Sequence, residues 1–326
     1  SVVARHDVEE VVICIPRASR DTLKRLWVLA DHSNVQMKIV PTLEEVLRGK
    51  VSIAAYRDIQ MADLLGRELV ELPADGPDFA PAYRGNRILI TGAGGSIGSE
   101  LATQLLNAGP EKLVLLDKDE NGLHDVYVRL GKGPNGSVVH PGVADIRFPE
   151  RLRAIFEQFQ PETVFHAAAH KHVPLMEMNP CEAILNNVIG TRNLVDLSKA
   201  TGVSRFVFIS TDKAVKPVSI MGASKRVCEM IVQTRGGDGK TRFACVRFGN
   251  VMGSRGSVIP FFQQQIARGG PVTVTHPEVQ RFLMTIPEAV RLVIQAGTLG
   301  ASGEIFVLDM GDPVPILDLA RDLIEL

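Results

Sequence analysis

The residues best suited to proton transfer lie in one stretch, STDKAVKPVSIMGASK, which runs from Ser210 to Lys225. On a helix, a tyrosine followed four residues later by a lysine can carry a proton to and from an alcohol. Lys225 stands at the lysine position of such a pair, but the tyrosine position holds Met221, whose thioether does not titrate. A second acid and base, Asp212 and Lys213, come a few residues earlier. If this chain acts on an alcohol, we expect these two groups to carry the chemistry.

The TDK triplet follows an apolar segment, RFVFIS, that is typical of a buried strand. Open α/β sheets bind ligands at the carboxyl ends of their strands, so Thr211, Asp212 and Lys213 fall where a site is expected. The alternative for Asp212 and Lys213 is an exposed ion pair, which would contribute little to stability. A methionine at position 221 is more often a packing residue than a chemical one.

Strands and helices alternate from Arg87 onward. Strand-like apolar segments occur at RILIT, KLVLLD, VVHPGVA, TVFHAAA, RFVFIS, FACVRF and IFVLD. Helical patterns begin near Ser96, Pro149, Asn179, Met221 and Pro287. Apolar strands that alternate with helices predict a parallel sheet covered on both faces, which is the doubly wound α/β fold of the Rossmann type.

The segment RILITGAGGSIGSEL places Gly92, Gly95 and Gly98 directly after a strand and at the start of a helix. Glycines let the backbone approach a pyrophosphate closely, and the helix N-terminus offers free N–H groups to the phosphates. The surrounding strand and helix favour a dinucleotide site over a glycine turn without a ligand. We therefore expect a bound dinucleotide that also contacts Ser96 and Ile97.

The second strand ends at Asp117, 19 residues after Gly98. A carboxylate there accepts hydrogen bonds from the adenosine ribose and repels a 2′-phosphate, which favours NAD over NADP. The adjacent Lys118 argues in the other direction, because a cation would attract a 2′-phosphate. Asp145 follows the third strand and either contacts adenine or caps a helix. The further expected cofactor contacts are Ile146, Ala167, Ala168, Lys171 and, on the nicotinamide ribose, Lys225.

The composition is that of an ordinary globular protein. The 326 residues carry a net charge of −1, with 45% hydrophobic and 22% charged residues, and the length allows two domains. A charge near zero gives no long-range attraction to nucleic acid or membrane. The four cysteines have no metal-ligand spacing and are expected to be buried thiols of a cytoplasmic protein. His166, His170 and His172 fit a ligand set poorly, so we predict no metal site.

No apolar run is long enough to span a membrane, and no signal peptide is recognisable. The first residue is not Met and the last residues follow a helical pattern, which suggests a piece of a longer protein. Residues 8–47 resemble a strand–helix–strand unit, and residues 48–84 an arm. We predict three regions: residues 1–80 as an N-terminal α/β fragment and linker arm, residues 81–250 with 286–310 as the NAD-binding domain, and residues 251–285 with 311–326 as a substrate-binding subdomain.

Six segments together resemble one known family: TGAGGSIGSEL, AAAHKHVPLMEMNP, NNVIGTRNL, STDKAVKPVSIMGASKR, RFGNVMGSRGSVIPFF and QRFLMTIPEAV. In the same order, they are similar to the UDP-N-acetylglucosamine 4,6-dehydratases of bacterial polysaccharide and glycan synthesis, within the extended short-chain dehydrogenase superfamily. The resemblance covers about residues 83–312. The N-terminal part resembles the domain that follows the transmembrane helices of long members. It therefore implies a parent protein anchored in the inner membrane, with this part in the cytoplasm.

The resemblance implies a reaction without net redox change. The C4 hydroxyl of the sugar is oxidised by hydride transfer to NAD, the C5 proton and the C6 hydroxyl are eliminated, and the hydride returns to C6. Lys213 is implied as the base at C5, Asp212 as the acid at C6, and Thr211 as the residue that orients the C4 oxygen. With Met221 inert, the C4 proton goes to Asp212 or leaves through water. Met occurs at this position within the family, and the N-terminal domain favours retention at C5.

The same resemblance implies the substrate contacts. Thr273 lies near the uracil and Arg281 at the diphosphate, where a planar guanidinium gives bidentate hydrogen bonds. Arg255 is either a ligand contact or a solvated loop charge, and Asn187 is expected to be structural. The implied substrate-binding residues are Lys171, Val173, Asn250, Arg255, Ser257, Val258, Ile259, Thr273 and Arg281.

Two other functions fit part of the sequence. A UDP-sugar C4 epimerase also begins with C4 oxidation, but it has no use for an acid and a base at C5 and C6. A non-catalytic module that binds NAD and UDP-sugar would fit Met221 and leave TDK unexplained. The expected partner is a UDP-N-acetylhexosamine substrate, with no nucleic acid and no membrane insertion of this chain. A homo-oligomer is expected, because helix pairing between subunits is common on this fold.

Overall fold

The computed structural model describes residues 8, 10–15, 22, 26, 29, 35–40, 57–58, 79–133, 135–235, 240–254, 256–299 and 302–325. The chain divides into two compact units. One comprises residues 1–69, 258–281 and 314–326, and the other comprises residues 70–257 and 282–313. The second unit contains the glycine-rich segment and the TDK triplet, and it is built around one large sheet.

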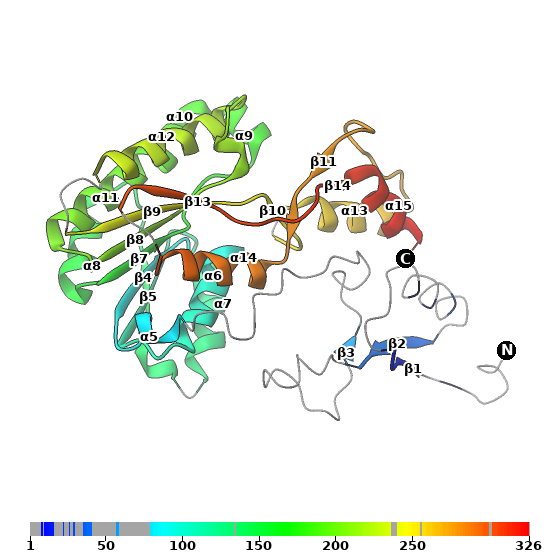
Figure 1. The fold of residues 1–326 in the computed structure, drawn as a ribbon, viewed down its shortest axis with the longest axis horizontal. Helices are drawn as coiled ribbons and strands as arrows, with labels where there is room; N and C mark the ends of the chain where they lie inside the picture. Colours follow the sequence, from blue (N-terminus) through cyan, green and yellow to red (C-terminus); the bar gives the residue numbers. More distant parts are fainter. Residues whose placement is uncertain are drawn as a thin grey trace. The chain divides into compact units, whose positions relative to one another are not determined.

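That sheet has seven strands in the order β13-β9-β8-β7-β4-β5-β6, and every neighbouring pair is parallel. The chain order reverses between β4 and β7, which is where doubly wound sheets open a crevice for a ligand. The predicted α/β fold is therefore confirmed (Figure 1). The strands are β4 (Arg87–Thr91), β5 (Lys112–Asp117), β6 (Val139–Val143), β7 (Thr163–His166), β8 (Arg205–Ile209), β9 (Arg242–Arg247) and β13 (Glu304–Val307).

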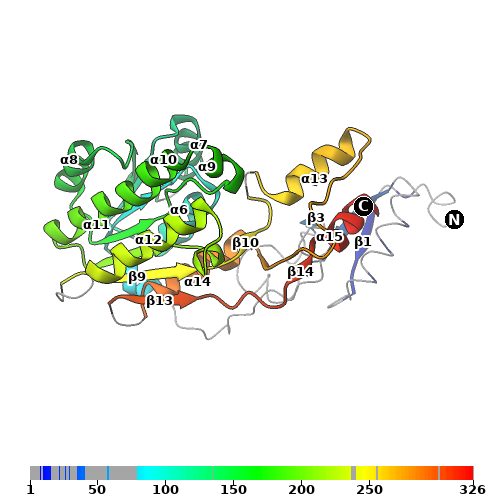
Figure 2. The same cartoon turned by 90° about the horizontal axis from the view of Figure 1, so that it is seen from above.

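Helices cover both faces of the sheet because both faces are apolar. In β4, Ile88 and Ile90 face one helix layer, whereas Leu89 faces the other. Each Å² of apolar surface that is buried contributes about 25 cal/mol to folding, so a sheet that is covered on two faces is strongly stabilised. The two layers lie above and below the sheet in Figure 1, and in the view from above in Figure 2 the second layer lies on the viewer's side of the sheet. The first contains α6 (Ser96–Leu106), α7 (Glu120–Gly131) and α14 (Ile286–Ala296), and the second contains α8 (Pro149–Phe159), α11 (Gly190–Thr201) and α12 (Ile220–Arg235).

Local signals fix where several helices begin. Pro149 occupies the first turn of α8, where its missing N–H costs nothing. Thr285 and Glu288 form a capping box at the start of α14, each side chain bonding the backbone N–H of the other. Before α11 the chain runs through α9 (Val173–Met178), α10 (Pro180–Glu182) and a π-helix, η2 (Ala183–Ile189).

The smaller elements of the two units are strand pairs, short helices and 3-10 turns. In the first unit, β1 (Glu10–Ile13) and β2 (Gln36–Ile39) pair in parallel, as strands joined by a crossover would, and the helix expected between them lies largely outside the described residues. In the same unit, β3 (Arg57–Asp58) pairs with β2, and β11 (Gln280–Arg281) pairs with β14 (Val314–Pro315). Its helices α13 (Val258–Ala267) and α15 (Ile316–Glu325) contact each other. The second unit adds α5 (Ala80–Tyr83), η1 (Gly136–Val138), η3 (Asp212–Ala214) and the parallel pair of β10 (Asn250–Val251) with β12 (Leu283–Met284).

The cysteines only partly follow the prediction of buried thiols. All four are free, and Cys228 and Cys245 are buried in the second unit. The prediction is wrong for Cys14 and Cys181, which are exposed: Cys14 directly follows β1, and Cys181 lies in the short helix α10. Within the described residues, no helix is long and apolar enough to cross a membrane.

Candidate active site

The glycine-rich turn brings three backbone segments into close contact. Gly92 has a φ of +71°, and a Cβ there would lie 2.6 Å from the backbone nitrogen of Ala168, after β7. A Cβ on Gly98 would press against the carbonyl oxygen of Gly92. Gly95 is the N-cap residue of α6, so the first turn of that helix is open to an anion. Ser96 and Ile97 follow as its first helical residues. This is the backbone geometry that the sequence predicted.

A cavity of about 150 Å³ lies beside this turn, at the point where the strand order reverses. Small side chains keep it open, as expected for Ala167 and Ala168. Its lining residues are Gly92, Gly95, Leu116, Asp117, Lys118, Ala144, Ile146, Ala167, Ala168, Ala169, His170 and Asn186.

Asp117 at the end of β5 braces the glycine turn. Its Oδ2 accepts a hydrogen bond from the backbone N–H of Gly94 at 2.8 Å, and its Oδ1 accepts one from the N–H of Asp119 at 2.9 Å. Each carboxylate oxygen can accept a second bond, so the predicted contact with a ribose remains chemically open. The same residue therefore shapes the turn and lines the cavity.

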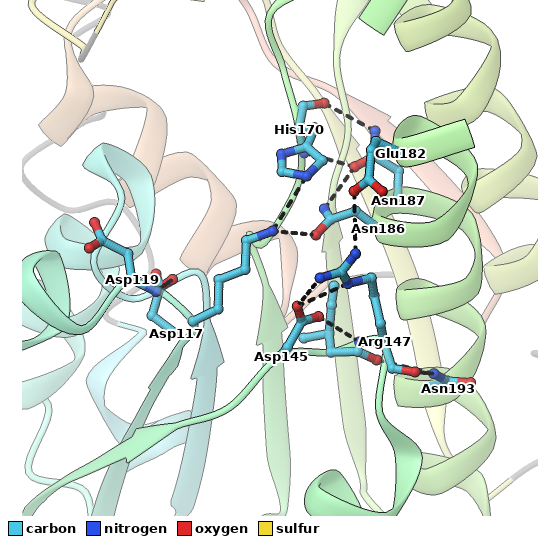
Figure 3. Close-up of polar contacts among 11 residues, drawn as sticks. Asp117, Asp119, Asp145, Arg147, His170, Glu182, Asn186, Asn187 and Asn193 are labelled. Atoms are coloured by element: carbon cyan, nitrogen blue, oxygen red, sulfur yellow. Dashed lines mark hydrogen bonds and ion pairs between the residues drawn. The ribbon is translucent and has the colours of Figure 1, made fainter. Parts of the chain in front are cut away.

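Polar side chains that follow β5, β6 and β7 are bonded to one another and to residues of α10 and the π-helix (Figure 3). The Lys118 ammonium donates to Asn186 Oδ1 at 3.1 Å and lies 3.4 Å from His170 Nε2. The Arg147 guanidinium bonds Asp145 Oδ2 at 2.7 Å and reaches Glu182 at 3.3 Å (Figure 3). Lys118 is thus already engaged with the cavity wall.

Asp145 is held by its neighbour Arg147. Burial alone would raise the pKa of Asp145, but the hydrogen bonds and charge of Arg147 hold it below its usual value. Asp145 does not cap α8, because Phe148 occupies the N-cap position. The sequence left two interpretations of Asp145, an adenine contact or a helix cap. The helix cap is wrong.

The TDK triplet forms a compact cluster just beyond β8. Thr211 caps η3, its hydroxyl accepting from the N–H of Lys213 at 3.3 Å and donating to Asp212 Oδ1 at 2.8 Å. The Lys213 ammonium donates to Asp212 Oδ1 at 3.0 Å and to Asn250 Oδ1 at 2.9 Å. Helix α12 approaches so closely that a Cβ on Gly222 would press against the Lys213 carbonyl. An acid and a base are thereby fixed side by side at the carboxyl edge of the sheet.

Met221 and Lys225 on α12 have different surroundings. Met221 is 4% exposed and packs against Met176 and Ala183, which are the surroundings of a packing residue. Lys225 is buried, donates to the Ile209 carbonyl at 2.6 Å and lies 3.9 Å from the centre of the Phe208 ring. Burial lowers the pKa of Lys225 to about 8.

Glu229, one turn after Lys225, is a residue of the site that the sequence analysis missed. Its fully buried carboxylate accepts a hydrogen bond from the Ser210 hydroxyl at 2.6 Å and two from Arg247, at 2.7 and 2.6 Å. Arg226 adds a bond at 2.9 Å. Burial alone would raise the pKa of Glu229, but these bonds lower it. Glu229 therefore ties α12 to the end of β9 and to Ser210, the residue between β8 and the TDK triplet.

The π-helix turns two consecutive asparagines inward. Asn186 faces Lys118, whereas Asn187 accepts from the His170 N–H at 2.8 Å and donates to the Ser224 hydroxyl at 3.0 Å. An extra residue per turn allows neighbouring side chains to serve two partners on one side, and π-turns are frequent at functional sites. Asn187 thus braces the segment after β7 against α12, the structural role expected for it.

The three histidines near β7 lie in separate places: His166 ends β7, His170 lines the cavity, and His172 is the N-cap residue of α9. His166 is fully buried between the hydroxyls of Thr91, at 2.7 Å, and Thr191, at 2.9 Å. Burial, with a smaller contribution from the Lys225 charge, lowers the pKa of His166 well below its usual value, so the ring is neutral. Throughout the described parts of the chain, no group of three or more His, Cys, Asp or Glu side chains could hold a metal ion.

The predicted substrate residues are divided between the two units. Asn250 lies in the TDK cluster, Lys171 is exposed beyond β7, and Val173 begins α9 beside the Met221 packing cluster. The Ser257 hydroxyl is buried and lacks a hydrogen-bond partner among the described residues. Arg255 lies outside the described residues.

The remaining four belong to the first unit. Val258 and Ile259 begin α13. The Thr273 hydroxyl accepts from Gln265 at 2.8 Å, and Arg281 lies exposed in β11.

The chain resembles proteins of polysaccharide synthesis. Residues 88–326 match the family model described as "Polysaccharide biosynthesis protein". The chain is 47% identical over 327 residues to the capsular polysaccharide biosynthesis protein CapD of Staphylococcus aureus, covering 100% of this chain and 54% of that protein. It thus spans about half the length of this relative.

Shorter relatives and a solved structure agree. The chain is 35% identical over 230 residues to a UDP-N-acetylglucosamine 4,6-dehydratase (inverting) of Campylobacter jejuni, covering 69% of this chain and 67% of that protein. The solved structure of Pen from Bacillus thuringiensis superposes with a TM-score of 0.71 at 34% identity, covering 74% of this chain and 76% of that one. The chain therefore belongs to this polysaccharide biosynthesis family, among the nucleotide-sugar dehydratases of the extended short-chain dehydrogenase superfamily.

Proposed function

We propose that this chain is the catalytic part of a UDP-N-acetylhexosamine 4,6-dehydratase that acts on UDP-N-acetylglucosamine with bound NAD. The observation that carries the proposal is the contact of Lys213 Nζ with Asp212 Oδ1, at 3.0 Å, at the carboxyl edge of the sheet. Removal of water from C5 and C6 needs a base and an acid side by side, and this pair supplies both. Relatives with dehydratase activity in their names support the same reaction.

The glycine turn and the cavity beside it fit a dinucleotide. The backbone N–H groups at the start of α6 suit its pyrophosphate, with Gly95, Ser96 and Ile97 closest to the helix end. The Asp117 carboxylate suits a ribose diol better than a 2′-phosphate, which supports NAD over NADP. When bound, a nicotinamide ring supplies an acceptor for the C4 hydride and a donor for C6.

The chain's own residues move the protons. Asp212, as a carboxylate, takes the C4 hydroxyl proton while Thr211 orients that oxygen. Neutral Lys213 takes the C5 proton, and Asp212 passes its proton to the C6 hydroxyl, which leaves as water. Lys213 then returns its proton to C5, so both residues end as they began and the sugar has lost one water. Return to the same face gives retention at C5, and Lys225 and Lys171 serve the cofactor.

An epimerase is the second candidate, because several UDP-glucose 4-epimerases also resemble this chain. Oxidation and reduction at C4 need no proton removal at C5 and no acid at C6. The Asp212–Lys213 pair would then have no task, and the same holds for a module that only binds NAD and UDP-sugar. The pair therefore supports the dehydratase over both.

Proton NMR of the chain with NAD and UDP-N-acetylglucosamine separates these functions. A dehydratase gives a new C6 methyl doublet, an epimerase gives UDP-N-acetylgalactosamine, and a binding module leaves the substrate unchanged. We expect Lys213→Ala and Asp212→Asn to lose about 100-fold or more of the methyl signal while nucleotide binding remains. Lys216→Ala, an exposed lysine of the same loop, is the matched control. Full activity in both variants would defeat the assignment.

The setting of the parent protein is also proposed. A relative of about twice the length and a 45% identical archaeal protein named as a membrane protein support a membrane-anchored parent with this part in the cytoplasm. We propose a homo-oligomer as well. Fractionation of the full-length protein and light scattering of this chain test the two statements.

A further inference from the structure

Asn250 holds the amine of the proposed base, although the two residues are 37 positions apart. Its Oδ1 accepts from Lys213 Nζ at 2.9 Å, slightly closer than the Asp212 oxygen at 3.0 Å. Asn250 is itself fixed by the backbone. It lies in the β10–β12 pair, and its N–H donates to the Phe282 carbonyl at 3.0 Å. A backbone held by strand pairing therefore presents a neutral acceptor to the long side chain of Lys213.

Two acceptors have a definite effect on an amine. A neutral lysine has two N–H bonds and one lone pair. If Asp212 and Asn250 each accept one N–H, the lone pair is confined to the remaining direction. Removing one acceptor lets the amine rotate, and a base that must meet one particular proton loses rate when it is misaligned.

We propose that Asn250 is a positioning residue that aims the lone pair of Lys213 at the proton to be removed, a role beyond the substrate contact that the resemblance implies. The proposal rests on the proposed function, because it needs Lys213 to act as a base. In this proposal, Asp212 supplies the acid, and Asn250 orients the Lys213 lone pair. Asp212 shares its Oδ1 with the Thr211 hydroxyl at 2.8 Å and changes protonation during the reaction. The amide of Asn250 keeps accepting throughout.

Two substitutions at one position test the role. Asn250→Ala removes the acceptor, and we expect kcat to fall by about 10- to 100-fold while KM for UDP-N-acetylglucosamine changes less than about threefold. Asn250→Asp keeps an acceptor but makes it anionic. The ammonium form is then favoured, so the rising limb of the pH–rate profile should move about one unit to higher pH with the maximal kcat largely kept. Asn107→Ala, at the exposed C-cap of α6, is the control.

The outcomes separate the two proposals. Circular dichroism and the melting temperature show whether each variant folds. If Asn250→Ala does not fold, the pH shift of Asn250→Asp tests the positioning role. A KM raised tenfold or more with kcat unchanged makes Asn250 a substrate contact only and overturns the inference. Wild-type kinetics in Asn250→Ala, or an unshifted profile in Asn250→Asp, also overturn it. If the wild type gives no methyl doublet, the proposed function fails and the inference fails with it.

Discussion

The proposed cofactor end of the second unit, at the glycine turn, and its proposed catalytic end, at the TDK triplet, are built in different ways. At the cofactor end, backbone meets backbone: Gly92 lies against Ala168, and Gly98 against the Gly92 carbonyl. At the catalytic end, side chains meet side chains from separate strands and helices. Lys213 reaches Asn250 across 37 positions, and Ser210 reaches Glu229 across 19.

This difference determines what each end tolerates. A backbone site depends on the absence of side-chain atoms, so adding one methyl group destroys it. A side-chain network depends on charges and hydrogen-bond acceptors. It is therefore disrupted when one side chain changes its charge, even if the shape of that side chain stays the same. The first kind of site leaves a short sequence motif, whereas the second leaves residues scattered along the chain.

The largest effect is expected from Gly98→Ala. The new Cβ would press against the Gly92 carbonyl, so α6 must move away from β4. The pyrophosphate would lose charge-assisted hydrogen bonds of about 1.5–3 kcal/mol each, and two such losses weaken NAD binding roughly 100-fold or more. Isothermal titration with NAD measures this change. Gly131→Ala, where the nearest described neighbour of the Cβ would be Tyr127 at 3.9 Å, should bind normally. Equal binding by both variants would mean that the turn holds no phosphate.

Glu229→Gln is expected to break the catalytic end while sparing the cofactor end. It leaves Arg247 and Arg226 without their buried counter-charge, which costs about 3 kcal/mol or more of unfolding free energy. The shifted ends of β8 and β9 should also lower kcat by about 100-fold. Urea unfolding and the methyl-doublet assay measure the two effects, with Glu157→Gln on the exposed side of α8 as the control. Unchanged stability together with unchanged kcat would remove Glu229 from the site.

Most of the second unit could be predicted because its signals are local. Seven predicted runs correspond to the seven strands of the large sheet. The five inner strands are buried on both faces and are therefore largely apolar along their length, whereas the edge strands β6 and β13 are partly exposed. Proline and the Thr285–Glu288 capping box likewise announce where helices begin. The glycine turn was predicted for the same reason: a strand, a turn and a helix that are adjacent in sequence form it.

What escaped prediction depends on contacts between distant segments. Glu229 follows Lys225 by four residues and, in sequence, resembles half of an exposed helix pair. Only the approach of β8 and β9 buries it, and the one hint was Arg247, a charged residue at the end of an apolar strand that needs a counter-charge. The π-helix at 183–189 and the contact between Asn250 and Lys213 have the same origin, because tertiary packing creates both.

A smaller effect on stability, which appears as a pH dependence, is expected from Lys225→Met. The pKa of Lys225 is about 8 in the folded chain, below the ordinary 10.5, so between these values the unfolded chain binds the proton more strongly. This group therefore raises the free energy of unfolding as pH increases from 8 to 10.5, by on the order of 3 kcal/mol. The pKa values of Cys228 and Cys245 are raised by burial, so these thiols lower the free energy of unfolding as pH increases, in the wild type and in the variant alike. The difference between wild type and variant, measured by urea unfolding across this range, should show the rise, and the exposed Lys132→Met should not remove it.

The smallest effect is expected from Met221→Leu, and it bears on the position where a tyrosine would carry the proton. Met221 packs against Met176 and Ala183, so a side chain of similar volume should cost less than about 1.5 kcal/mol. Because the thioether has no proton to give, kcat should stay within about twofold of wild type. The methyl-doublet assay and the melting temperature measure both quantities. A tenfold loss of kcat in a stably folded variant would place position 221 at the reacting sugar. Met221 would then not be a packing residue alone. Unchanged kcat would leave the proton chemistry with the TDK triplet, where side chains from η3 and β10 meet.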